Sequence, residues 1–162
     1  MDFSIETNRL LLRPFSIKDA EAYFKMTRDK SIQKYTPGSC PISIEETLSR
    51  IQICYSKADF KRDFYLLLEE KTSHDIIGSI MLTQNWSMKD YDCAYFVAAP
   101  YRRKGYMTEA LTGFINVVSA LPQPIFFTIE ADNIPSLKLI HQIPGITEYA
   151  HSDAYVFVLQ GK

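Results

Sequence analysis

The stretch that decides the fold is AYFVAAPYRRKGYMTEAL, residues 94–111. Its first residues are apolar and aromatic, which predicts the end of a β-strand, and Pro100 stops that strand. After a basic turn, residues 107–120 place Ala110 and Phe114 one helical turn apart on an apolar face. A strand, a tight turn and a helix are therefore expected in direct succession.

The turn between this strand and this helix suits an anion. It holds Arg102, Arg103 and Lys104, followed by Gly105. A helix N-terminus offers unsatisfied backbone N–H groups and a partial positive charge, and glycine lets the backbone approach a phosphate closely. A pyrophosphate is therefore a sensible ligand, although a solvated basic turn on the surface has the same composition.

Strand and helix patterns continue on both sides of this stretch and together indicate one domain. The strand patterns are short apolar or alternating runs, and they occupy residues 9–13, 64–69, 76–83, 90–98 and 124–130, with two more within 147–160. The helical patterns combine capping residues with helical spacing, and they occupy about residues 17–28, 43–57, 107–120 and 133–142. No repeat or linker interrupts them, so we expect residues 1–162 to form a single domain.

The composition of the 162-residue chain excludes several classes of function. It is 46% hydrophobic and 23% charged with a formal net charge of -1, which gives no basic excess for nucleic acid. The start of the chain has no signal-peptide pattern, and no apolar run is long enough to span a bilayer. Cys40, Cys54 and Cys93 lack metal-ligand spacing. We therefore expect a cytoplasmic protein with free thiols, no metal, and no nucleic-acid or membrane partner.

Three segments together resemble the GNAT superfamily of N-acetyltransferases. Residues 102–107 are similar to its acetyl-CoA motif Arg/Gln-x-x-Gly-x-Gly/Ala, with Arg102 first and Gly105 fourth. Residues 6–14, ETNRLLLRP, resemble the opening of the branch related to the ribosomal-protein N-terminal acetyltransferases (RimJ/RimL-like). Residues 132–136, DNIPS, resemble the family's Asn-x-x-Ser at the start of its last helix. The three segments occur in the family's order and extend over nearly the whole chain.

The resemblance implies an α/β (α+β) GNAT fold. This fold has a mixed, mostly antiparallel sheet of about seven strands and four helices. Its order is strand, helix, helix, three strands, helix, strand, helix and two strands, which agrees with the patterns above. The fourth and fifth strands should splay apart and hold acetyl-CoA in the gap, because the amide-rich pantetheine arm can satisfy strand backbone groups left unpaired there.

The resemblance also implies the residues that bind the cosubstrate. The pyrophosphate should be held by backbone N–H groups of the turn, those of Arg103, Lys104, Gly105, Tyr106 and Met107, while the side chain of Arg102 adds positive charge beside it. Phe96 and Val97 should contact pantetheine from their strand, where a backbone N–H polarises the thioester carbonyl. Asn133 should contact the same arm. No metal takes part in this scheme.

Three further residues are candidates for catalysis. Ser136 is expected either to hydrogen-bond or protonate the departing thiolate, or simply to cap the last helix. An ammonium acceptor must lose a proton before it attacks. Asp92, on the strand beside the thioester, and Glu130, on the facing strand, are candidates for the base.

Two departures from the family pattern leave the function open. Met107 stands where the motif has Gly or Ala, and Ile140 stands where many members carry a tyrosine acid. The first hypothesis is an enzyme that transfers an acetyl group from acetyl-CoA to a primary amine, on a protein N-terminus or a small molecule, by direct transfer in a ternary complex. The alternative is a non-catalytic acyl-CoA-binding or sensor module. Either form is expected to be a monomer or a homodimer.

Overall fold

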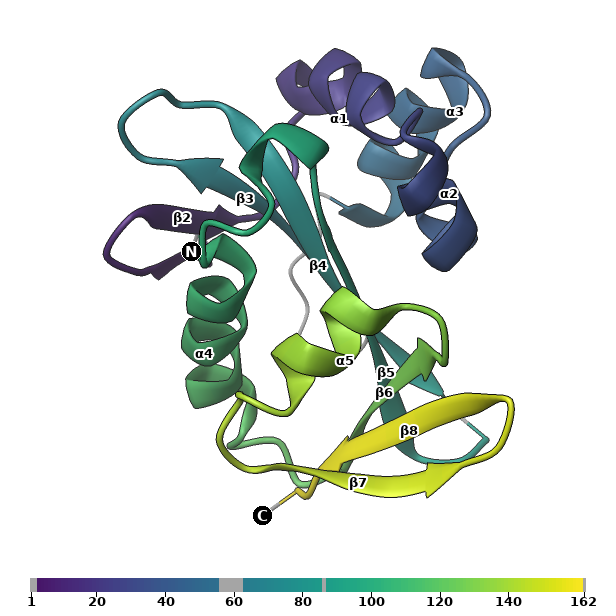
Figure 1. Ribbon diagram of the computed structural model, residues 1–162. Helices are drawn as coiled ribbons and strands as arrows, with labels where there is room; N and C mark the ends of the chain where they lie inside the picture. The colour runs from purple at the N-terminus through teal and green to yellow at the C-terminus, as the bar shows by residue number, and fades with distance from the viewer. Residues whose placement is uncertain (1–2, 56–62, 86, 162) are drawn as a thin grey trace.

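The computed structural model describes residues 3–55, 63–85 and 87–161 (Figure 1). Eight strands form one sheet in the order β1-β2-β3-β4-β5-β6-β8-β7. The strands are β1 Ile5–Glu6, β2 Leu10–Arg13, β3 Phe64–Glu70, β4 Ile76–Asn85, β5 Asp90–Val97, β6 Ile125–Glu130, β7 Ile146–His151 and β8 Ala154–Leu159. The α-helices in these ranges are α1 Ala20–Met26, α2 Lys30–Tyr35, α3 Ile44–Arg50, α4 Tyr106–Val118 and α5 Ile134–Ile140. The predicted α/β class with a mixed sheet is confirmed.

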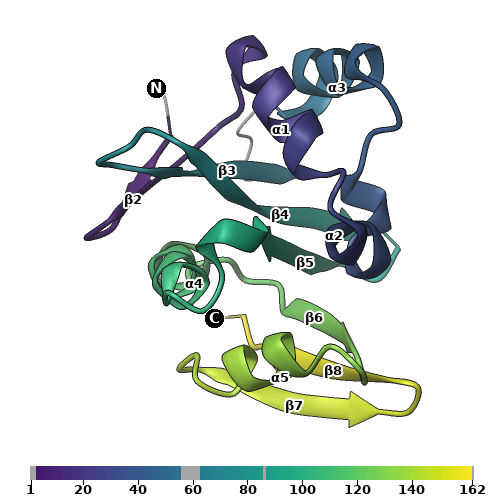
Figure 2. The same ribbon diagram turned by 45° about the horizontal axis from the view of Figure 1, so that its top comes forward.

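The sheet opens between β5 and β6. Every other pair of neighbouring strands is antiparallel, whereas β5 and β6 are parallel and paired only at Tyr91 with Ile125 and at Asp92 with Phe126. Beyond Asp92 the two strands diverge (Figure 2). Strands β5 and β6 are the fourth and fifth of the predicted order, so the expected splay is confirmed.

Helices cover the sheet on both faces (Figures 1 and 2). On one face, the buried residues of α4 form a helical stripe: Met107, Ala110, Leu111, Phe114, Ile115 and Val118. They share a core with apolar side chains of β2 to β6 and β8. On the other face, Tyr23 of α1 packs with Phe96 of β5 and Leu67 of β3. Burying each large apolar side chain contributes about 1.5–3 kcal/mol, so these two cores hold β5 in place from both sides.

The structure contains more elements than the seven strands and four helices expected. Strand β1 has only two residues, too few for an alternating pattern. Helix α2 has six residues and begins where the Asp29 side chain accepts a hydrogen bond from the Ser31 N–H, so it is too short to show an apolar stripe. Helical structure after α3 continues as a π turn over Ile51–Tyr55, and the predicted helical residues 56–57 lie outside the described ones.

The described residues contain neither a membrane-spanning helix nor a metal-binding cluster. No helix of residues 3–55, 63–85 and 87–161 is long and apolar enough to cross a membrane. Within these ranges, no three His, Cys, Asp or Glu side chains are grouped to hold a metal ion. Cys40 and Cys93 are free thiols, as predicted, whereas the side chain of Cys54 lies outside the described ones.

Candidate active site

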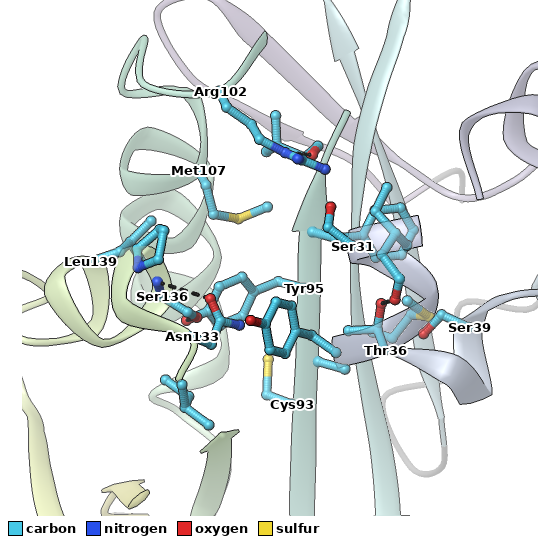
Figure 3. A pocket seen from close by; sticks show the side chains of 18 of the residues that line it. Ser31, Thr36, Ser39, Cys93, Tyr95, Arg102, Met107, Asn133, Ser136 and Leu139 are labelled. Atoms are coloured by element: carbon cyan, nitrogen blue, oxygen red, sulfur yellow. Dashed lines mark hydrogen bonds between the residues drawn. The ribbon is translucent and has the colours of Figure 1, made fainter. Parts of the chain in front are cut away.

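One cavity of about 1660 Å³ occupies the opening in the sheet (Figure 3). Its walls come from β5 and β6, from α2 on one side and α5 on the other, and from the N-terminus of α4. The predicted site residues that line it are Asp92, Phe96, Val97, Arg102, Arg103, Gly105, Tyr106, Met107, Glu130, Asn133 and Ser136. Lys104 is the one predicted residue that is not in the lining, and its ammonium lies 5.6 Å from the centre of the Tyr101 ring instead.

The turn of residues 102–107, called the cradle turn below, leaves its backbone donors free. Gly105 is the N-cap of α4 with φ of +77°, and Arg103 also has a positive φ, of 59°. Glu109 is the first residue whose N–H bonds back to the turn, at the Gly105 carbonyl. Among the described residues, the N–H groups of residues 103–108 have no acceptor. The geometry is therefore that of an anion-binding helix N-terminus.

The N-terminal segment braces the cradle turn. The Thr7 hydroxyl donates to Glu109 Oε1 over 2.6 Å, and Arg9 donates to the same carboxylate through its backbone N–H and its Nε, each over 2.7 Å. Arg9 Nη1 also donates to the Lys104 carbonyl over 2.9 Å, and its guanidinium lies 4.3 Å from the centre of the Tyr106 ring. In the sequence this segment resembles the family opening but shows no link to residues 102–107. Its contact with the cradle turn is visible only in the structure.

The charge of Glu109 is stabilised by these contacts. Burial alone would raise its pKa, but the hydrogen bonds from Thr7 and Arg9 outweigh burial and hold the pKa below its usual value. A charged Glu109 in the first turn of α4 also suits the helix dipole. Charge-assisted bonds therefore fix the first turn of α4 to the turn between β1 and β2.

The Arg102 side chain connects the cradle turn to two other elements. Its Nε donates to the Val97 carbonyl at the end of β5 over 2.9 Å, and its Nη2 lies 3.1 Å from a carboxylate oxygen of Asp29, before α2. At its other end, α2 is joined to the turn before α5 by an ion pair between Lys34 and Asp132. Helix α2 therefore borders the cavity with an ion pair near each of its ends.

Strand β5 directs alternate side chains to the two faces of the sheet. Cys93 and Val97 lie in the core with α4, whereas Phe96 packs with Tyr23 of α1. Asp92 has the parity of Phe96, so it faces the side of α1 to α3. Burial is the main reason that its pKa lies above the usual value, and the nearby charge of Asp90 adds to the effect.

The second candidate base lies on the same face as the first. Asp92 pairs with Phe126 of β6, and alternation carries that face along the strand through Thr128 to Glu130. Glu130 is exposed, and both carboxylates border the cavity. The sequence left the side of Asp92 open, and the structure places the two carboxylates on the side of α2.

Ser136 is not the cap of α5. Asn133 is the N-cap, and its Oδ1 accepts the Ser136 N–H over 3.4 Å. The capping interpretation of Ser136 is therefore wrong. Its hydroxyl oxygen lies 2.6 Å from the hydroxyl of Tyr95, which reaches across from β5 (Figure 3). Burial raises the pKa of Tyr95.

Tyr95 is a site residue that sequence analysis missed. In the sequence, Tyr95 is one of several aromatic residues of the strand pattern, and nothing in that pattern separates a site residue from a packing residue. Strand alternation could have indicated its side, because Tyr95 lies on the same face of β5 as Cys93 and Val97, the face that α5 covers. The partner hydroxyl lies 41 positions further along the chain, and no local pattern indicates such a pair.

The two departures from the family pattern occupy buried positions. Ile140 is fully buried at the end of α5, in the core shared with α4. It brings no proton donor to the site. Met107 is 7% exposed, packs in the same core, and borders the cavity from the start of α4 (Figure 3). Its side chain therefore forms part of the apolar wall, and the backbone of the cradle turn stays open.

Comparison with known proteins agrees with this geometry. The sequence model of the acetyltransferase (GNAT) domain family matches residues 9–143, well over half of the chain. Two curated relatives from Bacillus subtilis (strain 168) are uncharacterized N-acetyltransferases. YnaD is 27% identical over 141 residues, with 86% of this chain and 80% of the relative covered. YoaA is 26% identical over 151 residues, with coverage of 88% and 84%.

Solved structures share the fold at low identity. A GNAT-family acetyltransferase from Bacillus anthracis superposes with a TM-score of 0.79 at 20% identity, and 98% of each chain is covered. RimL, a ribosomal L7/L12 α-N-protein acetyltransferase in complex with coenzyme A, superposes with a TM-score of 0.79 at 14% identity, again over 98% of each chain. At these identities the likeness shows the fold alone.

Proposed function

We propose that this chain, which belongs to the GNAT acetyltransferase family, transfers the acetyl group of acetyl-CoA directly to a primary amine bound in the same cavity. Family membership makes the chain an acyltransferase, and the roles of donor, acceptor and individual residues are our proposal. The observation that carries it is that one cavity joins the free N–H groups of the cradle turn to the open strand edges and to Ser136. Its volume exceeds the roughly 300–1,000 Å³ of a pocket for one small ligand.

The donor would lie along the opening from α4 to α5. The pyrophosphate accepts hydrogen bonds from the N–H groups of residues 103–107, with Arg102 and Arg103 adding positive charge. The pantetheine arm then passes between β5 and β6, beside Phe96 and Val97. The Asn133 side chain uses its oxygen as the helix cap, so its NH₂ group remains for the arm. Two proteins of this fold support the ligand, RimL with coenzyme A and MccE with acetyl-CoA and AMP.

The acceptor would enter from the side of α2, where Asp92 and Glu130 supply negative charge for an ammonium. We assign the role of base to Asp92, because burial raises its pKa towards neutral pH. The amine nitrogen attacks the thioester carbonyl, and a backbone N–H of β5 stabilises the oxyanion. The C–N bond forms, the C–S bond breaks, and the thiolate departs beside Ser136.

A ternary complex fits this arrangement better than a covalent intermediate. The acceptor side carries carboxylates, and the departing sulfur faces hydroxyl groups on the opposite side of β5. Holding both substrates in one cavity supplies much of the rate by proximity alone. The alternative of a non-catalytic acyl-CoA-binding module is motivated by Met107 and by the missing tyrosine at Ile140. The hydroxyls of Tyr95 and Ser136 beside the cavity support the enzyme instead, because they offer hydrogen bonds to a departing thiolate. We propose that residues 1–162 act as a single domain.

Calorimetric titration with acetyl-CoA and then with CoA tests the proposal directly. We expect both to bind with micromolar affinity, with one molecule per chain. Release of the CoA thiol from acetyl-CoA is then followed with a panel of primary amines and of peptides with free N-termini. Absence of binding at millimolar acetyl-CoA would contradict the proposal, and binding without turnover on any amine would favour the non-catalytic module.

A further inference from the structure

The hydroxyl groups of Tyr95 and Ser136 form a pair at the edge of the cavity. Tyr95 reaches from β5 and Ser136 from the first turn of α5, and their oxygens are 2.6 Å apart (Figure 3). We propose that Tyr95 is a positioning residue for acetyl transfer, which donates its hydrogen bond to Ser136 Oγ and so turns the Ser136 proton towards the departing sulfur. The inference rests on the proposed function and adds a residue that the family motifs do not contain.

The direction of this hydrogen bond follows from the chemistry of the two groups. Each hydroxyl can donate once and accept through its lone pairs. A phenol is the more acidic of the two, and therefore the better donor. Burial raises the pKa of Tyr95, which keeps the phenol protonated and able to donate at neutral pH.

Once Tyr95 donates, the Ser136 proton needs another acceptor. Among the described residues, the Ser136 hydroxyl has Tyr95 as its only hydrogen-bond partner. Asn133 already accepts the Ser136 N–H, so the helix does not require the hydroxyl for its cap. A proton without an acceptor beside an open cavity points to a ligand atom, and the sulfur of the bound donor is the atom proposed to lie there.

The chemical step balances without a change in charge on either residue. The amine nitrogen forms the C–N bond, and the electron pair of the breaking C–S bond moves to sulfur. Ser136 hydrogen-bonds the resulting thiolate while Tyr95 holds the serine oxygen. The proton that the nitrogen loses goes to the base or to solvent, and the thiolate takes up a proton from solvent after the bond has broken. Tyr95 and Ser136 neither gain nor lose a proton overall.

Bound CoA itself provides a test that needs no acceptor. If the pair stabilises a thiolate, the pKa of the CoA thiol is lower when bound than when free, which is measured from the ultraviolet absorbance of the thiolate across a pH titration. We expect Tyr95→Phe to raise the pKa of the bound thiol by about half a unit to one unit, the size of one hydrogen bond. The affinity for CoA should stay within about twofold, because a contact to the charged form alone is lost.

A double-mutant cycle separates positioning from a structural effect. In a Ser136→Ala background, Tyr95→Phe should no longer shift the pKa of the bound thiol, because Tyr95 acts only through Ser136. Tyr149→Phe removes a hydroxyl from a tyrosine that is 66% exposed on β7 and serves as the matched control. Replacement of Tyr95 by a ring-fluorinated tyrosine, a stronger donor of the same shape, should lower the pKa of the bound thiol.

The outcomes separate this inference from the proposed function. CoA that binds with an unchanged thiol pKa in Tyr95→Phe, while Ser136→Ala raises that pKa, would overturn the positioning role alone. Equal shifts from Tyr95→Phe in the presence and absence of Ser136 would do the same. If Tyr95→Phe does not fold, an unchanged thiol pKa in the fluorinated protein decides against the proposal. Failure of the wild-type protein to bind CoA would remove the proposed function together with this inference.

Discussion

The two ends of the cavity are held by different kinds of contact. At the cradle turn, the Glu109 side chain is 18% exposed and accepts three hydrogen bonds from Thr7 and Arg9. At the other end, α2 is joined to the turn before α5 by Lys34 and Asp132, whose side chains are 55% and 61% exposed. Exposed ion pairs contribute little to stability, whereas charge-assisted bonds shielded from water contribute more. The cradle turn, where we propose that the donor binds, is thus held by the stronger contacts, and the side of α2, the proposed acceptor end, is held by the weaker ones.

The largest expected effect comes from a charge placed in the cradle turn. We expect Gly105→Asp to weaken CoA binding by at least about 100-fold in calorimetry, because a carboxylate roughly 4 Å from a phosphate is repelled by about 4 kcal/mol. The fold should survive, because Asp tolerates positive φ better than most residues and a Cβ at this position would lie 3.4 Å from Arg9 Nη2.

Gly105→Asn is the matched control for that charge. Asn has the same shape and the same tolerance of positive φ, so its affinity for CoA should fall by no more than about tenfold. Equal losses for Asp and Asn would mean that the side chain blocks the turn by its size, and the electrostatic account of the cradle turn would then be wrong.

The same contrast explains what the sequence could and could not predict. The strand, turn and helix of residues 94–111 are contiguous, so the cradle turn could be identified from local pattern and confirmed in place. The brace joins Thr7 to Glu109 across 102 positions, and the hydroxyl pair joins Tyr95 to Ser136 across 41. Such contacts depend on strand register and on which face a strand presents, and neither is set by neighbouring residues.

Helix α2 shows a second limit of the sequence. Its six residues carry no readable stripe, and only Ile32 is buried in the core with Tyr23 and Phe96. The partners of its two ion pairs, Arg102 and Asp132, lie far along the chain. The face of the sheet on which Asp92 lies is likewise set by the register of β5 with β4 and β6. For the cradle turn the sequence therefore predicts individual residues, whereas for the side of α2, where we propose that the acceptor binds, it offers only candidate carboxylates.

A smaller effect is expected from weakening the brace. Glu109→Gln places an NH₂ group where Arg9 and Thr7 require an acceptor, so we expect a loss of about 1 kcal/mol in the free energy of unfolding at neutral pH. The pKa of Glu109 is lowered in the folded protein. Its contribution is therefore present above the pKa of an unfolded glutamate, about 4.3, and is lost as the pH falls through the lower folded pKa.

Denaturant unfolding at neutral and acidic pH measures this contribution. The difference in the free energy of unfolding between the wild-type protein and Glu109→Gln should shrink as the pH falls from about 4.3 through the lower pKa of Glu109 in the folded protein. Glu21→Gln is the matched control, because Glu21 also lies in the first turn of a helix but is exposed on α1. A difference that persists unchanged at acidic pH would show that the loss comes from packing and not from the charge of Glu109.

The smallest expected effect lies at the acceptor end and has the opposite sign. The pKa of Asp92 is raised, chiefly by burial, so the folded state favours its neutral form. The charged Asp92 carboxylate therefore destabilises the fold at pH values above its pKa in the folded protein. This penalty is absent at pH values below its pKa in the unfolded chain, about 3.9. Asp92→Asn should stabilise the protein at neutral pH by less than about 1 kcal/mol, because Asp92 is only partly desolvated and stays exposed to solvent on its cavity side. The gain should vanish at acidic pH.

Asp153→Asn, in the exposed turn between β7 and β8, controls for the general loss of a carboxylate. A less stable Asp92→Asn protein at neutral pH would mean that the carboxylate accepts stabilising contacts, and its assignment as base would lose its physical basis. An Asp92→Asn protein that is more stable but has lost turnover with an identified amine would support the assignment of Asp92 as the base. The cavity would then keep a charge that destabilises the fold because acetyl transfer requires it, and the more weakly held acceptor end would be where function opposes stability.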